Sequence, residues 1–94
     1  MKLAIQFIIA LLLSACAQSE EHARRNAEYD WPNVNVVYVV SDNVMRDCQS
    51  RSATACAYPA SAPNGTCVIY HKRSPIATTL EHEALHCRYG RWHG

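Results

Sequence analysis

Apolar and polar residues alternate in blocks along this chain, and the blocks from residue 31 onward predict a small domain of strands and helices. Residues 34–40 consist of β-branched valines with one tyrosine and one asparagine, which predicts the strongest strand. This stretch is apolar on both faces over its second half, so we expect a central strand. Ser41 and Asp42 follow and are in position to cap a short helix over residues 43–49.

A second pair of strands is predicted further along the chain. Residues 53–58 are a weaker apolar stretch, and residues 66–71 are typical of a strand. The loop between them is rich in proline and ends in Asn64 and Gly65, a dipeptide that favours a turn. We therefore expect these two stretches to form a hairpin with a wide loop.

The last predicted element is a helix that ends at Tyr89, with Gly90 as its C-terminal residue. It begins at about Ile76 or Thr78, and Thr78 or Thr79 can cap it. The expected buried stripe of this helix consists of Ile76, Leu80, Ala84 and Cys87. The order strand, helix, strand, strand, helix predicts an α+β fold with a small sheet of about three strands.

The first residues predict a signal peptide, residues 1–15, that precedes the domain over residues 31–94. Lys2 is followed by an apolar run that is short for a membrane span, and then by the small residues Ser14 and Ala15. A permanent anchor helix is the alternative.

The end of this signal resembles the lipoprotein box of bacteria, with the residues Leu13-Ser14-Ala15-Cys16. The resemblance implies that Cys16 carries lipid. Residues 17–30 are polar and charged and have no apolar face, so we expect residues 16–30 to form a flexible tether between the lipid and the domain. Ala17 follows, which by the sorting rule of such lipoproteins implies the outer membrane, facing the periplasm of the cell envelope. The alternative is an ordinary cysteine after a secretory signal.

Charge and cysteine content narrow the class of protein. A formal net charge of +1 gives no electrostatic case for a nucleic acid partner. After Cys16, four cysteines remain in a small exported domain, where disulfides are expected. Of the three possible pairings we favour Cys48 with Cys56, and Cys67 with Cys87, which would staple strand 66–71 to the last helix. A zinc–thiolate site is the weaker alternative.

The last predicted helix carries the sequence His-Glu-x-x-His, from His82 to His86. Residues four apart share a helix face, so both imidazoles can bind one zinc ion. Glu83 can reach a water molecule beside the metal without being a ligand. His93 is the favoured third ligand because Gly90 allows the chain to turn back.

Three other residues remain open as the third ligand: His71, Glu81 and Asp47. The alternative for His82 and His86 themselves is a pair of polar residues on a solvated helix face. His-Glu-x-x-His also occurs by chance in unrelated proteins.

The motif resembles that of the zincin metallopeptidases. The tail resembles a variant of the metzincin pattern, in which three residues rather than two separate His86 from Gly90. The resemblance implies a minimal zincin-like core, one Zn²⁺ ion, and hydrolysis of peptide bonds with Glu83 as general base. It also implies that the strand before the active-site helix, Thr66 to His71, lies at the sheet edge and pairs with extended substrate.

The alternative function is that of a non-enzymatic envelope lipoprotein that binds metal or a protein partner. Tyr89 and Tyr70 are candidates for donating a hydrogen bond to an oxyanion, although each is more often a packing residue. Glu83 distinguishes the two functions, because a purely structural metal site does not require it.

Overall fold

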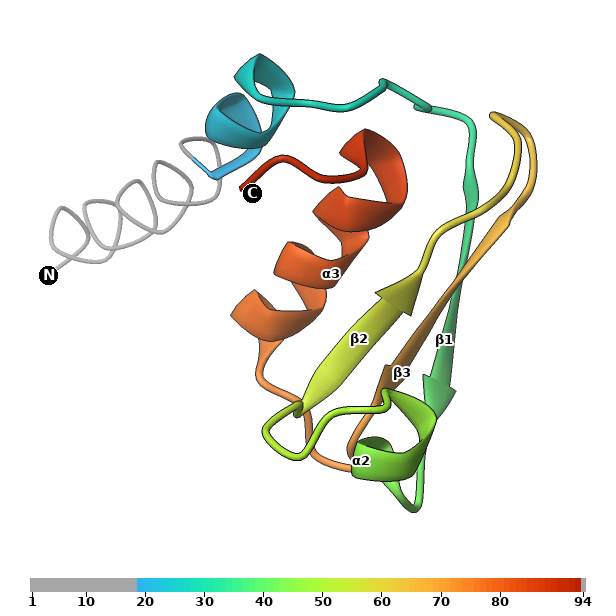
Figure 1. The fold of residues 1–94 in the computed structure, drawn as a ribbon, viewed down its shortest axis with the longest axis vertical. Helices are drawn as coiled ribbons and strands as arrows, with labels where there is room; N and C mark the ends of the chain where they lie inside the picture. Colours follow the sequence, from blue (N-terminus) through green and yellow to red (C-terminus); the bar gives the residue numbers. More distant parts are fainter. Residues whose placement is uncertain (1–18, 94) are drawn as a thin grey trace, which may run out of the picture.

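A computed structural model of the chain describes residues 19–93 and consists of a three-stranded sheet with a long helix on one face (Figure 1). Its elements, in chain order, are β1 (Asn35–Val40), α2 (Val44–Asp47), β2 (Ala55–Tyr58), β3 (Thr66–His71) and α3 (Ala77–Tyr89). The predicted α+β fold, with about three strands and a C-terminal helix, is therefore confirmed.

The strand order is β1-β3-β2, so β3 is the central strand. β1 pairs with β3 in parallel, and β2 pairs with β3 antiparallel, as the predicted hairpin requires. The predictions of a central strand over 34–40 and of an edge strand from Thr66 to His71 are both wrong. Apolar residues on both faces do not make a strand central, since Val37 and Tyr38 of β1 are 38% and 49% exposed.

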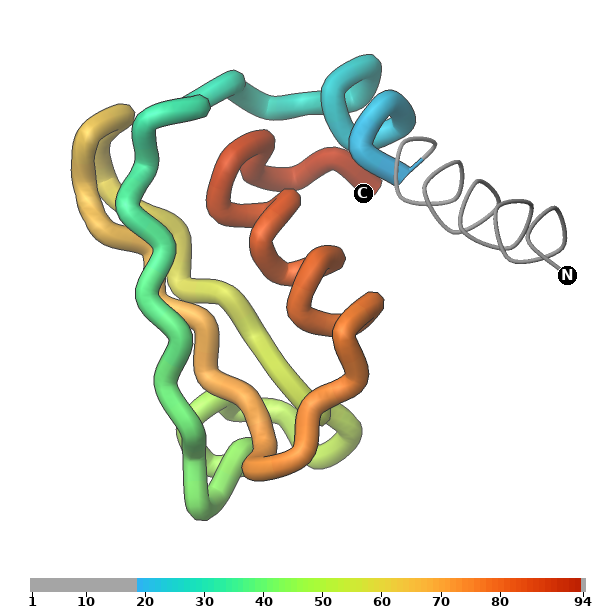
Figure 2. Tube along the Cα trace, turned by 180° about the vertical axis from the view of Figure 1, so that it is seen from behind, coloured from blue at the N-terminus to red at the C-terminus, as the bar shows by residue number. Residues whose placement is uncertain are grey.

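The core lies between β3 and α3. Cys67 and Ile69 on β3 and Cys87 on α3 are completely buried, and Leu80 and Ala84 pack against them. Figure 2 shows the same two layers from behind. Ile76, expected in the buried stripe of the helix, is instead 61% exposed because it is the N-cap residue and precedes the helix.

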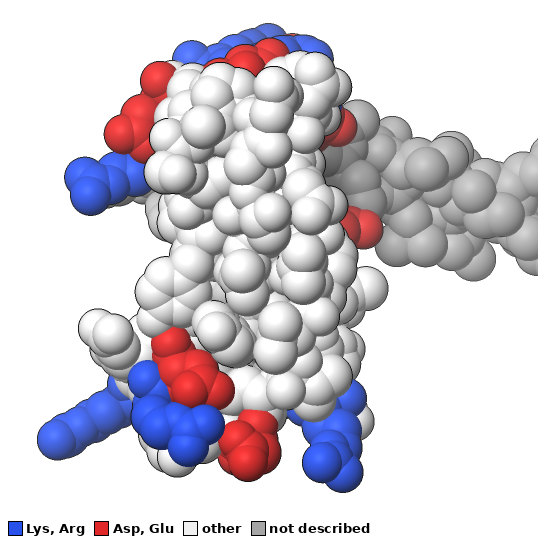
Figure 3. All heavy atoms as spheres, turned by 90° about the vertical axis from the view of Figure 1, so that its right-hand side faces the viewer, with Lys and Arg blue, Asp and Glu red and all other residues white. Residues whose placement is uncertain are grey.

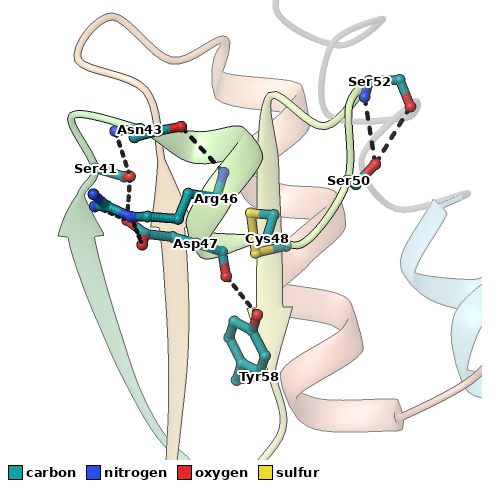
Figure 4. Close-up of a disulfide and its surroundings, with 9 residues drawn as sticks. Ser41, Asn43, Arg46, Asp47, Cys48, Ser50, Ser52 and Tyr58 are labelled. Carbon is teal, nitrogen blue, oxygen red and sulfur yellow. Dashed lines mark hydrogen bonds and ion pairs between the residues drawn. A yellow bond between two sulfur atoms is a disulfide. The ribbon is translucent and has the colours of Figure 1, made fainter.

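Both favoured disulfides are present, Cys48–Cys56 and Cys67–Cys87. The first joins the end of α2 to β2 (Figure 4). The second joins the central strand to α3, and its two Cα atoms are 5.6 Å apart. The second disulfide therefore fixes the helix that carries the candidate site to the middle of the sheet.

The two helix starts differ in part from the predictions. Asn43, rather than Ser41 or Asp42, caps α2, and its side chain accepts a hydrogen bond from the backbone N–H of Arg46 (Figure 4). Ser41 supports that cap by accepting a hydrogen bond from the N–H of Asn43. At α3, Ile76 is the N-cap and makes no side-chain capping bond, so neither predicted threonine has that role.

Residues 19–30 pack on α3 and do not extend as the tether that the sequence predicted. Residues 19–25 are helical, and Ala23 is completely buried against Tyr89 and Trp92, with Ala27 beside them. The polar composition concealed this contact, because only two small alanines, Ala23 in the helix and Ala27 after it, face the end of α3. Figures 1 and 2 both place this segment beside the C-terminal end of α3.

The predicted signal peptide and Cys16 lie outside the described residues. Within residues 19–93, no helix has the length and apolar character needed to cross a membrane. On the side of the molecule where β1 lies, the middle is uncharged, and basic and acidic side chains gather together at both ends (Figure 3).

Candidate metal centre

Three imidazole rings converge at the C-terminal half of α3. His82 and His86 lie one turn apart on the helix, and the loop after Gly90 brings His93 back to them. The Nε2 atoms of His82 and His86 are 3.2 Å apart, and those of His86 and His93 are 2.7 Å apart. All three ligand atoms lie within 4.8 Å of one another. The structure thus brings together the three histidines that the sequence predicted as ligands.

The distance between His82 and His86 is that of a tetrahedral metal site. Zinc–nitrogen bonds of about 2.0–2.1 Å place two ligand nitrogens roughly 3.3 Å apart at the tetrahedral angle. The separation between His82 and His86 is 3.2 Å, whereas the 2.7 Å between His86 and His93 is clearly shorter, so binding of an ion requires the ring of His93 to shift. His93 is exposed, so solvent reaches the cluster on the side of this residue.

The carbonyl of Gly90 determines which nitrogen of His86 is free. Nδ1 of His86 lies 2.8 Å from that oxygen, which can only accept a hydrogen bond. Nδ1 must therefore carry the proton, and Nε2 of the neutral ring presents its lone pair to the other two histidines. A second hydrogen bond that fixes the ring and its tautomer in this way is typical of metal-binding histidines.

Gly90 has a backbone conformation that only glycine adopts easily, with φ of 71°. A Cβ atom there would lie 2.5 Å from Oε1 of Glu28 and 2.7 Å from the ring of Tyr29. The prediction that Gly90 ends the helix and turns the chain is confirmed, and its N–H bonds to the carbonyl of His86.

Trp92 supports the histidine rings from the protein side. It is 92% buried, since its exposed fraction is 8%. Its ring stacks on His86 at 5.3 Å and lies 5.1 Å from that of His82. A residue so packed restricts the loop that carries His93.

Burial favours the uncharged imidazoles that bind metal. It lowers the pKa of His82, and the neighbouring charges of His86 and His93 lower it further. Burial also lowers the pKa of His86, although the hydrogen bond to Gly90 opposes that shift. Both rings therefore stay neutral to lower pH than an ordinary histidine.

Glu83 lines the same pocket as the three histidines. Burial raises the pKa of its carboxyl group, while the nearby charge of His93 and a hydrogen bond from the backbone of Ala57 oppose the shift. A carboxylate with a raised pKa is a better proton acceptor near neutral pH. Glu83 therefore combines a place in the pocket of the three histidines with a carboxyl group that is more basic than usual.

The pocket has a volume of about 580 Å³ and opens beside β2. Its remaining walls come from Cys56, Ala57, Pro59 and Ala60 on one side, and from Glu28, Tyr29, Gly90 and Arg91 on the other. β2 is an edge strand, and Ala57 reaches Glu83 through its backbone. An unpaired strand edge therefore borders the candidate site.

The three alternative ligands do not belong to this cluster. His71 is buried at the end of β3, with Nδ1 2.7 Å from the carbonyl of Lys72. Asp47 lies on α2 and bonds to Ser41 and Arg46 (Figure 4). Glu81 lines a separate hollow on another side of α3. Among residues 19–93, the sole group arranged to hold a metal is the three-histidine cluster.

The two tyrosines considered as oxyanion donors also lie elsewhere. Tyr89 is completely buried, and its hydroxyl donates to Glu20. Tyr70 packs edge-on against Tyr58 and lines a different hollow. The tyrosine that lines the metal pocket is Tyr29, which the sequence did not single out.

Comparisons with known proteins leave the function to be argued from these residues. No protein-family model, no curated protein and no solved structure matches the chain.

Proposed function

We propose that this chain is a zinc-dependent metallopeptidase of the bacterial cell envelope, anchored by lipid at Cys16, with a minimal zincin-like site. The convergence of His82, His86 and His93, with Glu83 lining the same pocket, carries the proposal. A zinc ion bound there supplies a Lewis acid that polarises a carbonyl group and acidifies a bound water.

Glu83 acts as the general base in this proposal. It takes a proton from the water whose oxygen attacks the scissile carbonyl carbon. It then gives that proton to the amide nitrogen as the C–N bond breaks, which releases an amine and a carboxylate. The burial that raises the pKa of Glu83 supports the first step, because a more basic carboxylate accepts the proton more readily.

The substrate strand is assigned to β2, since β3 is central and has no free edge. β2 is the antiparallel edge strand next to the pocket, and an extended peptide can add to it through backbone hydrogen bonds. Such recognition demands little of the peptide sequence, which suits a chain with few residues to spare for side-chain pockets.

Hydrolysis of a fluorescently labelled, unfolded protein such as casein tests the proposal. The full chain, purified in detergent and loaded with zinc, should cleave casein. Glu83→Gln should lower the rate by a factor of about 10²–10⁴ and keep the metal, because only the proton transfer is lost. Glu81→Gln removes a carboxylate two positions away, outside the pocket, and should cleave like the wild type.

Equal rates for Glu83→Gln and the wild type would refute the role of Glu83. A zinc-loaded wild type that leaves casein and shorter extended peptides intact would favour the non-enzymatic metal-binding lipoprotein instead.

A further inference from the structure

We infer that Glu28 is a positioning residue for the third metal ligand, and that residues 28–31, named the strap here, form part of the metal centre. The inference rests on the proposed metal site, although not on peptidase activity. The strap crosses the C-terminal end of α3, where the loop to His93 begins. The strap and this end of the helix are more than fifty positions apart in the sequence.

The strap satisfies hydrogen-bond acceptors that the helix end leaves open. The last carbonyls of an α-helix have no partner within the helix. Here the backbone N–H of Glu28 donates to the carbonyl of Tyr89 at 2.9 Å, and that of Trp31 donates to the carbonyl of Arg88 at 2.9 Å. The side chains of Asp30 and Arg88 add an ion pair at 3.0 Å. The strap is thereby docked at a defined place on α3.

The carboxylate of Glu28 reaches past the helix into the ligand loop. Its Oε1 accepts a hydrogen bond from the backbone N–H of Arg91 at 3.2 Å, two positions before His93. The same carboxylate fills the space beside Gly90, where a Cβ atom would lie only 2.5 Å from Oε1. Glu28 therefore holds the loop from one side at the turn that directs His93 to the other ligands.

The same N-terminal segment also contacts the loop through Trp92. Ala23 is completely buried in a cluster with Trp92 and Tyr89, and the ring of His22 lies 5.8 Å from that of Trp92. Residues from 22 to 28 thus contact the loop from residue 91 to 93 at both Arg91 and Trp92. A ligand on a short loop needs such support, because small displacements of a ligand weaken metal binding.

Zinc affinity and a spectroscopic signature of the coordination test the inference. The full chain in detergent is titrated with zinc against a chromophoric chelator, and the visible absorption of the Co²⁺-loaded chain reports the ligand set. Glu28→Ala should weaken zinc binding by about 10–100-fold, as loss of an outer-shell partner does. Its Co²⁺ bands should also lose the intensity of a tetrahedral three-histidine site.

Two further variants separate positioning from a loss of charge or of stability. Glu28→Gln keeps an oxygen that can accept from Arg91, so it should restore wild-type affinity and the wild-type Co²⁺ spectrum. Glu21→Ala removes a carboxylate of the same segment that pairs with Arg25 and not with the loop, and it should match the wild type. Where Glu28→Ala does not fold, Glu28→Asp replaces it, because its carboxylate is one methylene too short.

Each outcome decides the inference. Zinc affinity and a Co²⁺ spectrum equal to the wild type in Glu28→Ala would overturn it and leave the metal site standing. Weaker binding in Glu28→Gln than in Glu28→Asp would overturn it as well, since charge rather than position would then matter. A wild type that binds neither metal would overturn both this inference and the proposed function.

Discussion

One carbonyl group, that of Gly90, prepares His86 to bind a metal. It fixes the proton on Nδ1 of His86, while the positive φ of Gly90 turns the chain towards His93. Glycine is needed there for its conformation and for the close approach of Glu28. Gly90 therefore determines the path of the chain, the packing beside Glu28 and the orientation of the ring of His86.

Gly90→Ala should lower the free energy of unfolding by about 1–3 kcal/mol, because a side chain at positive φ is strained and would meet Glu28 and Tyr29. It should also weaken zinc binding. Urea unfolding of the full chain measures the first effect. Gly65→Ala is the comparison, since Gly65 is not among the residues with positive φ and its added Cβ would lie 3.1 Å from Cβ of Ala60, against 2.5 Å from Glu28 at Gly90. Its cost should be smaller, and a cost at Gly65 as large as at Gly90 would contradict this explanation.

The lowered pKa values of His82 and His86 predict how the metal-free chain responds to acid. Below about pH 6.5 these two histidines bind protons in the unfolded chain but stay neutral in the folded chain, so the stability of the fold decreases as the pH falls. The raised pKa of Glu83 acts in the opposite sense, because burial favours its neutral form. The contribution of the two histidines to the pH dependence of stability is therefore measured by comparison with a variant that lacks both rings.

The unfolding temperature of the wild type, with chelator present, should drop more between about pH 7.5 and pH 5.5 than that of His82→Gln/His86→Gln. Thermal unfolding followed by circular dichroism measures the difference. An equal drop in both proteins would show that these rings do not resist protonation in the folded state.

At this scale the sequence predicted much of the site. The spacing of His82, Glu83 and His86 places them on neighbouring parts of one helix turn, and Gly90 predicts the turn to His93. Glu28 could not be predicted, because its contact with Arg91 spans 63 positions and follows no periodic pattern.

At the scale of elements, the C-terminal helix depends on the central strand beneath it. Cys67 and Cys87 are both completely buried, and their disulfide joins β3 to the buried face of α3. The helix turn with His86 is next to Cys87 in sequence, so a shift of α3 on the sheet would move the ligands too.

Replacing Cys67 and Cys87 by alanine should cost more stability than replacing Cys48 and Cys56. The disulfide Cys67–Cys87 closes a separation of 20 positions and Cys48–Cys56 only 8, and a longer closed loop restrains the unfolded chain more. A loss of about 2–5 kcal/mol is expected for the buried pair. Denaturant unfolding of the two double variants measures this, and a larger loss for Cys48 and Cys56 would contradict it.

The strand order shows where the sequence pattern failed. The types of the elements and their order followed from apolar spacing and turn residues. The pattern did not reveal which strand is central, because order depends on pairing partners far apart in sequence. The register of β1 with β3 joins Asn35 to Thr66, and nothing local to either strand specifies that neighbour.

At the scale of the whole molecule, residues 19–30 connect the N-terminal part of the chain to the candidate site through direct contacts with α3 and the loop after it. Residues 19–30 were expected to be a tether from their polar composition, yet Ala23 and Ala27 pack against the end of α3. Two small residues give a weak signal in a sequence, since their burial needs a partner surface that only the folded chain provides.

The most direct measurement of the central claim is the zinc content of the full chain at equilibrium. Dialysis against zinc, followed by elemental analysis, should give one zinc per chain for the wild type and for Glu83→Gln. Loss of an outer-shell partner weakens metal binding by about 10–100-fold. His93→Ala removes a ligand itself, so it should weaken zinc binding by at least that factor. His71→Gln alters a histidine outside the cluster and should bind like the wild type. A folded wild type without zinc, or a His93→Ala variant with undiminished affinity, would contradict the three-histidine metal centre.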